Sequence, residues 1–266
     1  MKKEESRFQP GTVFEGLTSI RAVLRASETG VSDRRITRVL VDETKKKSRA
    51  KELGWLKREA DARGFALDFV PASEIDGMTT GSTHGGIAAE CTDRTIPPLS
   101  CYTPPADGFA VMLEGIEDPY NFGYALRSLY ACGADAVVLS PRNWMSAAEV
   151  VCRSSAGASE LLPLYVSDPV ESARFFRSHG FRVLCAGIRD SVSSFDCKMK
   201  RPLYLIVGGE KRGISGALLD EADEIVRIDY GRAFGGSLSA ASAAAMLGYE
   251  VLRQNHQRLS HSPITG

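Results

Sequence analysis

The chain has 266 residues, of which 43% are hydrophobic and 25% charged, a composition that excludes a disordered, collagenous or coiled-coil protein. At about 150 residues per domain, this length predicts two domains. The 33 Lys and Arg residues balance the 33 Asp and Glu residues, which excludes a polybasic binder of the histone type but leaves room for a local basic patch.

The first six residues carry charges of both signs and precede no apolar stretch, so we expect no secretory signal and a cytosolic location. The longest nearly apolar stretches, 109–116 and 240–249, are far shorter than the about 20 residues that cross a bilayer, and no membrane span is expected. The six cysteines lack Cys-x-x-Cys spacing and form no ligand pair with the histidines. We therefore expect no metal site and six reduced, buried or half-buried thiols.

The first part of the chain has the pattern of a small α/β domain. An amphipathic segment at 17–26 precedes a strand at 36–41, a charged helix at 49–63, and strands at 65–70 and 86–91.

Two Pro-Pro pairs within residues 95–106 forbid a helix there and disfavour a central strand. We read this stretch as a connection between domains. The predicted organisation is a small domain at 1–97, a proline-rich linker at 98–106 and a second domain at 107–266.

After the linker, apolar strands alternate with helices. Strands are predicted at 109–115, 136–140, 182–186, 203–207 and 224–228, and helices at 124–132, 146–154, 170–179 and 238–254. This alternation predicts a mostly parallel sheet covered on both faces. In such sheets, ligands bind outside the carboxyl ends of the strands.

The strand at 109–115 runs into a loop of turn-forming residues, 117–123, and then a helix. Asn121 and Arg127 thereby lie near one strand end, where both suit a polar or anionic ligand at a helix N-terminus. A turn followed by a surface arginine accounts equally well for this spacing.

The strand at 203–207 ends in a glycine-rich loop, 208–216, which lets a ligand approach the backbone closely. The loop lacks the closing Gly-Lys-Ser/Thr of a P-loop and the spacing of a dinucleotide fingerprint. Glu210 within it also suits the exposed start of a helix.

A third cluster, 234–245, passes from a glycine turn into a helix of small residues. Ser237 or Ser239 caps this helix, or their hydroxyls line the same pocket as Asn121 and Arg127.

Together and in order, these three clusters resemble the SpoU (TrmH) branch of the SPOUT methyltransferases, which methylate RNA ribose 2′-hydroxyls with S-adenosylmethionine. The family's first motif, Asp-Pro-x-Asn-x-Gly followed by Arg, matches residues 118–123 and Arg127. The second, Gly-x-Glu-x-x-Gly after an apolar strand, matches 208–213, and the third, Ser-Leu-Asn before an alanine-rich helix, matches 237–239. The resemblance covers residues 109–253.

The upstream half is more loosely similar to the substrate-binding domain, of ribosomal protein L30e type, that ribosomal RNA members carry; the matching stretches are 14–16, 38–41 and 83–89. This similarity favours ribosomal RNA, and 23S ribosomal RNA in particular, over transfer RNA. Between residues 33 and 63, eleven Lys and Arg stand against six Asp and Glu, a surplus that suits phosphate contact or a solvated helix face.

The resemblance implies a carboxyl-terminal parallel α/β domain with a trefoil knot, and a homodimer with the site near the subunit interface. It implies that S-adenosylmethionine contacts Gly208, Ile228 and Leu238, with Gly187 and Gly209 as further candidates.

The resemblance also assigns catalytic roles. Arg127 would accept the proton of the ribose hydroxyl or, because arginine normally stays protonated, clamp a substrate phosphate. Asn121, Glu210 and Ser237 would orient the nucleotide and Arg127.

Two positions depart from the family pattern. Ser239 stands where the family usually has Asn, and Ile228 is followed by Asp229 in place of Pro. Serine has one short hydroxyl, whereas asparagine has a donor and an acceptor at longer reach. The changes would alter substrate choice, slow the reaction or mark an inactive descendant, but the retained motif residues favour an active enzyme.

Three alternatives stay open from the sequence. They are a transfer RNA ribose 2′-O-methyltransferase, a catalytically inactive RNA-binding or ribosome-assembly factor of the same fold, and a nicotinamide or flavin oxidoreductase. The last lacks the glycine fingerprint of its class.

Overall fold

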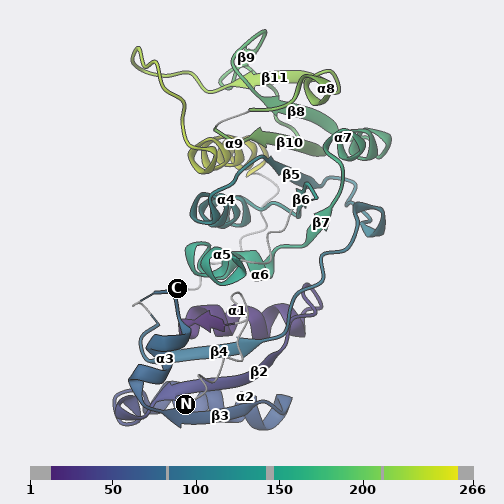
Figure 1. The fold of residues 1–266 in the computed structure, drawn as a ribbon. Coiled ribbons are helices and arrows are strands. Elements are labelled where there is room, and N and C mark those ends of the chain that lie inside the picture. Colours follow the sequence, from purple (N-terminus) through teal and green to yellow (C-terminus); the bar gives the residue numbers. More distant parts are fainter. Residues whose placement is uncertain (1–12, 82–83, 142–146, 211–212, 257–266) are drawn as a thin grey trace, which may run out of the picture. The chain divides into compact units, whose positions relative to one another are not determined.

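The computed structural model describes residues 13–81, 84–141, 147–210 and 213–256 (Figure 1). The chain divides into two compact units, the first comprising 1–95 and 143–161 and the second comprising 96–142 and 162–266. Within the described residues, no helix is both long and apolar enough to cross a membrane.

The first unit contains a four-stranded sheet. Its strands, in spatial order, are β1 (Val13–Glu15), β4 (Ile87–Cys91), β2 (Ile36–Asp42) and β3 (Ala66–Val70). β4 pairs antiparallel with β1 and β2, whereas β2 and β3 are parallel. The other early elements are α1 (Gly16–Glu28), the 3₁₀ turn η1 (Glu43–Lys45), α2 (Ala50–Arg63) and α3 (Ala72–Met78). α2 ends at Gly64, whose φ of 77° suits glycine at a helix C-terminus.

Two short helices from later in the chain, α5 (Ala148–Ser154) and α6 (Ala158–Leu161), also belong to the first unit. Cys152 of α5 lies in the same apolar core as Phe14 and Ile20. At Gly157, before α6, φ is 86° and a Cβ atom would lie 2.5 Å from that of Ala22, so only glycine allows this approach to α1. The first unit is therefore discontinuous in sequence. The boundaries given from the sequence, 1–97 and 107–266, assign each unit one continuous stretch and so leave this feature out.

The second unit contains a seven-stranded sheet in which every neighbouring pair is parallel, confirming the predicted sheet type. Its spatial order is β7 (Leu164–Val166), β6 (Ala136–Leu139), β5 (Phe109–Glu114), β10 (Leu203–Gly208), β8 (Arg182–Ala186), β11 (Glu224–Arg227) and β9 (Val192–Ser193). From β5 the chain runs outward through β6 to β7, and from β10 it runs outward on the other side to β11, so the β5–β10 pair is a topological switch point.

Helices cover both faces of this sheet (Figure 1). α4 (Pro119–Ala131) and α9 (Ala240–Asn255) pack together on one face, and α7 (Pro169–Ser178) and α8 (Gly216–Leu219) cover the other. In the core beneath α7, the ring of Phe176 stacks on that of Tyr204 with centroids 4.1 Å apart. The predicted linker contains the 3₁₀ turn η2 (Leu99–Cys101), and Pro98 forms a parallel bridge to Val166.

Two expectations from the sequence were wrong in detail. α4 begins at Pro119 rather than at residue 124, because Asp118 caps it by accepting a hydrogen bond from the Asn121 backbone N–H at 3.0 Å. Cys101 is exposed, although all six thiols were expected to be buried or half-buried. It lies in the proline-rich η2 segment at the surface of the second unit.

Candidate active site

The carboxyl ends of β5 and β10 meet at the switch point. Glu114 pairs with Gly208 in the parallel register, and the Gly209 N–H donates to the Glu114 carbonyl at 2.6 Å. A Cβ atom at Gly209 would overlap the carbonyl oxygen of Gly115. Glycine is therefore required here, because the two strand ends approach too closely for any side chain.

A side-chain hydrogen bond joins the first two sequence motifs. Asn121, in the first turn of α4, donates from Nδ2 to Oε1 of Glu210 at 3.2 Å. A cavity of about 120 Å³ lies at this junction and is lined by Asp118, Asn121, Gly209, Glu210 and Ala240, among others. Two segments 89 residues apart thus share one polar pocket.

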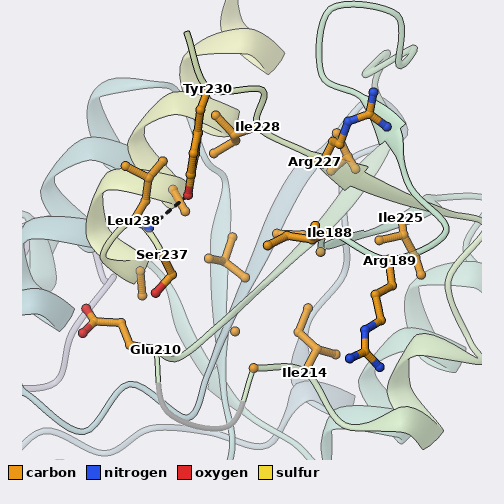
Figure 2. A pocket seen from close by; sticks show the side chains of 18 of the residues that line it. Ile188, Arg189, Glu210, Ile214, Ile225, Arg227, Ile228, Tyr230, Ser237 and Leu238 are labelled. Carbon is orange, nitrogen blue, oxygen red and sulfur yellow. Dashed lines mark hydrogen bonds between the residues drawn. The ribbon is translucent and has the colours of Figure 1, made fainter. Parts of the chain in front are cut away.

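The third motif is fixed at the start of α9. Ser239 is the N-cap of this helix, and its Oγ accepts a hydrogen bond from the Ser242 N–H at 3.1 Å. The Leu238 N–H donates to the hydroxyl of Tyr230 at 3.2 Å (Figure 2). Ser239 therefore serves as a helix cap, one of the two roles that the sequence left open.

A larger cavity of about 730 Å³ lies at the carboxyl ends of β8, β10 and β11 (Figure 2). Much of its wall is apolar, including Ile214 and Ile225. The predicted site residues that line it are Gly187, Gly208, Gly209, Glu210, Ile228, Ser237 and Leu238. A Cβ atom at Gly208 would lie 2.6 Å from the carbonyl carbon of Gly213, so this wall of the cavity is bare backbone.

Three predicted residues do not line the larger cavity: Asn121, Arg127 and Ser239. Asn121 is connected to this cavity by its hydrogen bond to Glu210, which lines the cavity wall. Arg127 is exposed on α4, and its side chain makes no hydrogen bond or ion pair with any residue in the described ranges. Six residues along a helix correspond to a rotation of about 240°, so Arg127 and Asn121 leave α4 in different directions.

Sequence reasoning missed the remaining polar and aromatic wall, which contains Arg189, Arg227, Tyr230, Arg232 and Phe234. The guanidinium of Arg227 is already engaged within the protein, since its Nε donates a hydrogen bond to the Asp229 carboxylate at 2.8 Å. Hydrogen bonds from Ser193 and Arg227 lower the pKa of that carboxyl. The available signal was the pair of aromatic residues within the glycine-rich stretch 230–236.

Among the described residues, no group of three or more His, Cys, Asp or Glu is placed to hold a metal ion.

The fold and this site define an α/β enzyme whose parallel sheet holds a ligand-sized cavity at the carboxyl ends of its strands. A family model described as the SpoU rRNA Methylase family matches residues 108–249, and one for RNA 2′-O ribose methyltransferase substrate binding matches residues 13–97. The chain belongs to the SpoU rRNA methylase family of RNA methyltransferases. The resemblance stated from the motifs is thereby confirmed.

Relatives and solved structures agree with this family. A TrmH family tRNA/rRNA methyltransferase of Staphylococcus saprophyticus is 26% identical over 236 residues, covering 86% of this chain and 92% of its own. A crystal structure of an RNA 2′-O ribose methyltransferase matches with a TM-score of 0.75 and 24% identity, over 92% of this chain and 88% of that one. An AdoMet-bound rRNA methyltransferase from Sinorhizobium meliloti matches with a TM-score of 0.76 and 22% identity, over 94% and 88%. At these identities, the structures establish the fold.

Proposed function

We propose that this protein transfers a methyl group from S-adenosylmethionine to a ribose 2′-hydroxyl of ribosomal RNA, with 23S ribosomal RNA as the expected substrate. The observation that carries the proposal is the hydrogen bond between Asn121 and Glu210. It joins the first two motifs at the edge of a cavity whose wall includes Ser237 and Leu238 of the third.

The larger cavity fits S-adenosylmethionine. Its volume of about 730 Å³ lies in the range typical of small-molecule sites. A Cβ atom at Gly208 would lie 2.6 Å from the Gly213 carbonyl carbon, and one at Gly187 would lie 2.8 Å from Cγ2 of Ile225, so close packing favours glycine at both positions of the cavity wall. We assign Gly187, Gly208, Gly209, Ile228 and Leu238 to holding the cofactor.

The proposed chemistry requires two contributions from the chain. When bound, S-adenosylmethionine supplies an already activated methyl group, as a sulfonium. A ribose hydroxyl is a poor nucleophile at neutral pH, so the protein must align its oxygen and help remove its proton. Asn121, Glu210 and Ser237 orient the nucleotide. Arg127 is exposed and its side chain has no partner in the described residues. It clamps a substrate phosphate or, as the resemblance implies, takes up the hydroxyl proton when the new O–C bond forms and the C–S bond of the sulfonium breaks.

Features of the first unit support an RNA substrate, and the name of one solved neighbour favours ribosomal RNA. This unit matches the substrate-binding model, and Lys45 and Lys47 are exposed on it, where they suit contact with phosphates. The S. meliloti neighbour is named an rRNA methyltransferase, whereas the S. saprophyticus relative is named for both tRNA and rRNA.

A map of 2′-O-methylation in ribosomal and transfer RNA tests the proposal. Cells lacking the gene should lose one methylated ribose in 23S ribosomal RNA, and the wild-type gene should restore it. Loss of a 2′-O-methyl group from transfer RNA instead would show that transfer RNA is the substrate. An unchanged map would favour an RNA-binding factor without methyltransferase activity.

We also propose that the protein is a homodimer that pairs through α4 and α9. These helices pack together, and their outer surfaces expose Tyr124, Met246 and Tyr249, which are 49%, 52% and 62% accessible. Exposed apolar side chains gathered on paired helices are typical of an interface. Light scattering should give twice the chain mass of 28.8 kDa, and the double variant Tyr124→Glu/Tyr249→Glu should be monomeric. A monomeric wild type would refute this assembly.

A further inference from the structure

The segment between β11 and α9 exposes two aromatic rings at the edge of the larger cavity. Phe234 is 63% accessible and Tyr230 is 38% accessible. Their ring centroids lie 6.0 Å apart, with an angle of 49° between the planes. Large aromatic rings normally bury most of their surface, so two exposed rings at a cavity indicate a surface that binds something.

Local contacts fix both rings before any ligand binds. The hydroxyl of Tyr230 accepts the Leu238 N–H at 3.2 Å, which ties the ring to the start of α9 (Figure 2). A Cβ atom at Gly236 would lie 2.6 Å from Cζ of Phe234, so glycine at this position lets the Phe234 ring lie against the backbone. Rings held by such contacts lose little conformational entropy when a ligand binds.

A separate hollow of about 360 Å³ lies at these rings, lined by Tyr230, Gly231, Arg232, Phe234 and Leu238. Four of these five residues also line the larger cavity, so the two spaces adjoin. Arg232 is exposed and has no hydrogen-bond or ion-pair partner among the described residues. Its guanidinium is free for a phosphate or for stacking on a base.

We propose that Tyr230, Arg232 and Phe234 form a stacking site for an unpaired nucleobase of the RNA substrate. The proposal rests on the proposed function and extends it to how the substrate is held. An unpaired nucleotide that has left the helical stack can place its ribose inside a cavity that a duplex cannot enter. RNA-binding proteins hold such bases on aromatic rings and arginine planes, and this hollow offers both beside the donor cavity.

A fluorescent RNA tests the site directly. The probe is a 12-nucleotide unstructured RNA containing one 2-aminopurine, mixed with the full chain and saturating S-adenosylhomocysteine. Wild type should bind and quench the 2-aminopurine as the base stacks. Phe234→Leu and Tyr230→Leu should bind the RNA at least about fivefold more weakly and lose the quenching. Phe234→Tyr, which restores a ring, should restore both.

Calorimetric titration of the same variants with S-adenosylhomocysteine separates this site from the cofactor cavity. Both rings also line the larger cavity, so the two losses are compared. Affinity for S-adenosylhomocysteine should fall clearly less than affinity for RNA, and retained binding shows that the variants are folded. The matched control is Phe195→Leu, which removes a ring that is 80% accessible and lines neither space; it should leave RNA binding unchanged.

Two results would overturn the stacking site. One is unchanged RNA affinity and quenching in the Phe234→Leu and Tyr230→Leu variants. The other is an equal loss of S-adenosylhomocysteine affinity, which would assign the rings to the cofactor. A wild type that binds no S-adenosylhomocysteine would refute the proposed function instead, while quenching of the RNA probe alone would still decide whether bases stack here.

Discussion

Arg34 and Glu160, 126 residues apart in the chain, form a buried ion pair. The Arg34 Nε donates to Oε2 of Glu160 at 3.1 Å, and the two side chains are only 2% and 4% accessible. Arg34 also donates to the carbonyl of Thr92 at 2.7 Å and lies 4.6 Å from the centroid of the Phe14 ring. The pair joins α6 to the sheet of the first unit, so the chain between β6 and β7 is part of the fold of that unit.

Arg34→Met should destabilise the first unit by about 3–5 kcal/mol, because it leaves the Glu160 carboxylate buried without its partner. Arg63→Met, also in the first unit, is the matched control. Arg63 is 31% accessible and pairs with Glu28 and Glu59, which are 68% and 24% accessible, and such exposed pairs contribute at most about 1 kcal/mol. Urea unfolding followed by circular dichroism measures both. Equal losses for the two variants would show that the buried pair has no special role.

Arg127→Ala should lower methyl transfer at least about a hundredfold while leaving S-adenosylmethionine affinity nearly unchanged. The reason is that this side chain points to solvent from α4 and does not line the cofactor cavity. Radiolabelled methyl transfer to RNA and calorimetric cofactor binding are the two readouts. Arg174→Ala, which removes another exposed arginine, should be active. Parallel loss of cofactor affinity and transfer in Arg127→Ala would contradict the RNA-side role.

Ser239→Asn should preserve or raise activity, because asparagine caps a helix as well as serine does and adds a donor at longer reach. Ser239→Ala should instead cost about 1 kcal/mol of stability, since the cap bond to the Ser242 N–H is lost. Thermal melting and methyl transfer measure the two effects. A sharp fall in the activity of Ser239→Asn would mean that serine has become part of a rearranged site.

Cys101 should be the first thiol to react with a maleimide at pH 8, because it is exposed while the other five are buried. Burial also raises the pKa of Cys152 and Cys185 to about 12, so at pH 8 these thiols stay protonated and unreactive. Mass spectrometry should locate one rapidly labelled site, and Cys101→Ser should abolish it. Rapid labelling of Cys152 would indicate that α5 opens readily from the first unit.

The sequence was sufficient for the sheet of the second unit because its central strands are long apolar runs. β5 and β10, each six residues, were found with ends within two residues. β1, β7 and β9 have only two or three residues, too few for periodicity to distinguish from a loop. The placement of α5 and α6 in the first unit was also beyond reach, since it depends on tertiary partners such as Arg34 with Glu160.

Only those site residues that belong to one of the three sequence motifs could be predicted. The glycines after β10 are required by close backbone approach, which leaves a recognisable pattern. Tyr230 and Phe234 carry no such spacing, and their relation to the cavity appears only in the structure, where the Leu238 N–H meets the Tyr230 hydroxyl. The direction of Arg127 was likewise hidden, because the start of α4 at Pro119 depends on the Asp118 cap.

The most direct test of the account is calorimetric titration of S-adenosylmethionine into the full chain and into a Gly209→Val variant. Because a side chain at residue 209 would overlap the Gly115 carbonyl, the variant should separate the ends of β5 and β10 and deform the cavity. We expect one site per chain for wild type and at least about tenfold weaker binding for the variant, whose circular dichroism spectrum should remain that of a folded chain. Absence of any binding by wild type at millimolar cofactor would contradict the claim that the three motifs build a methyl-donor site.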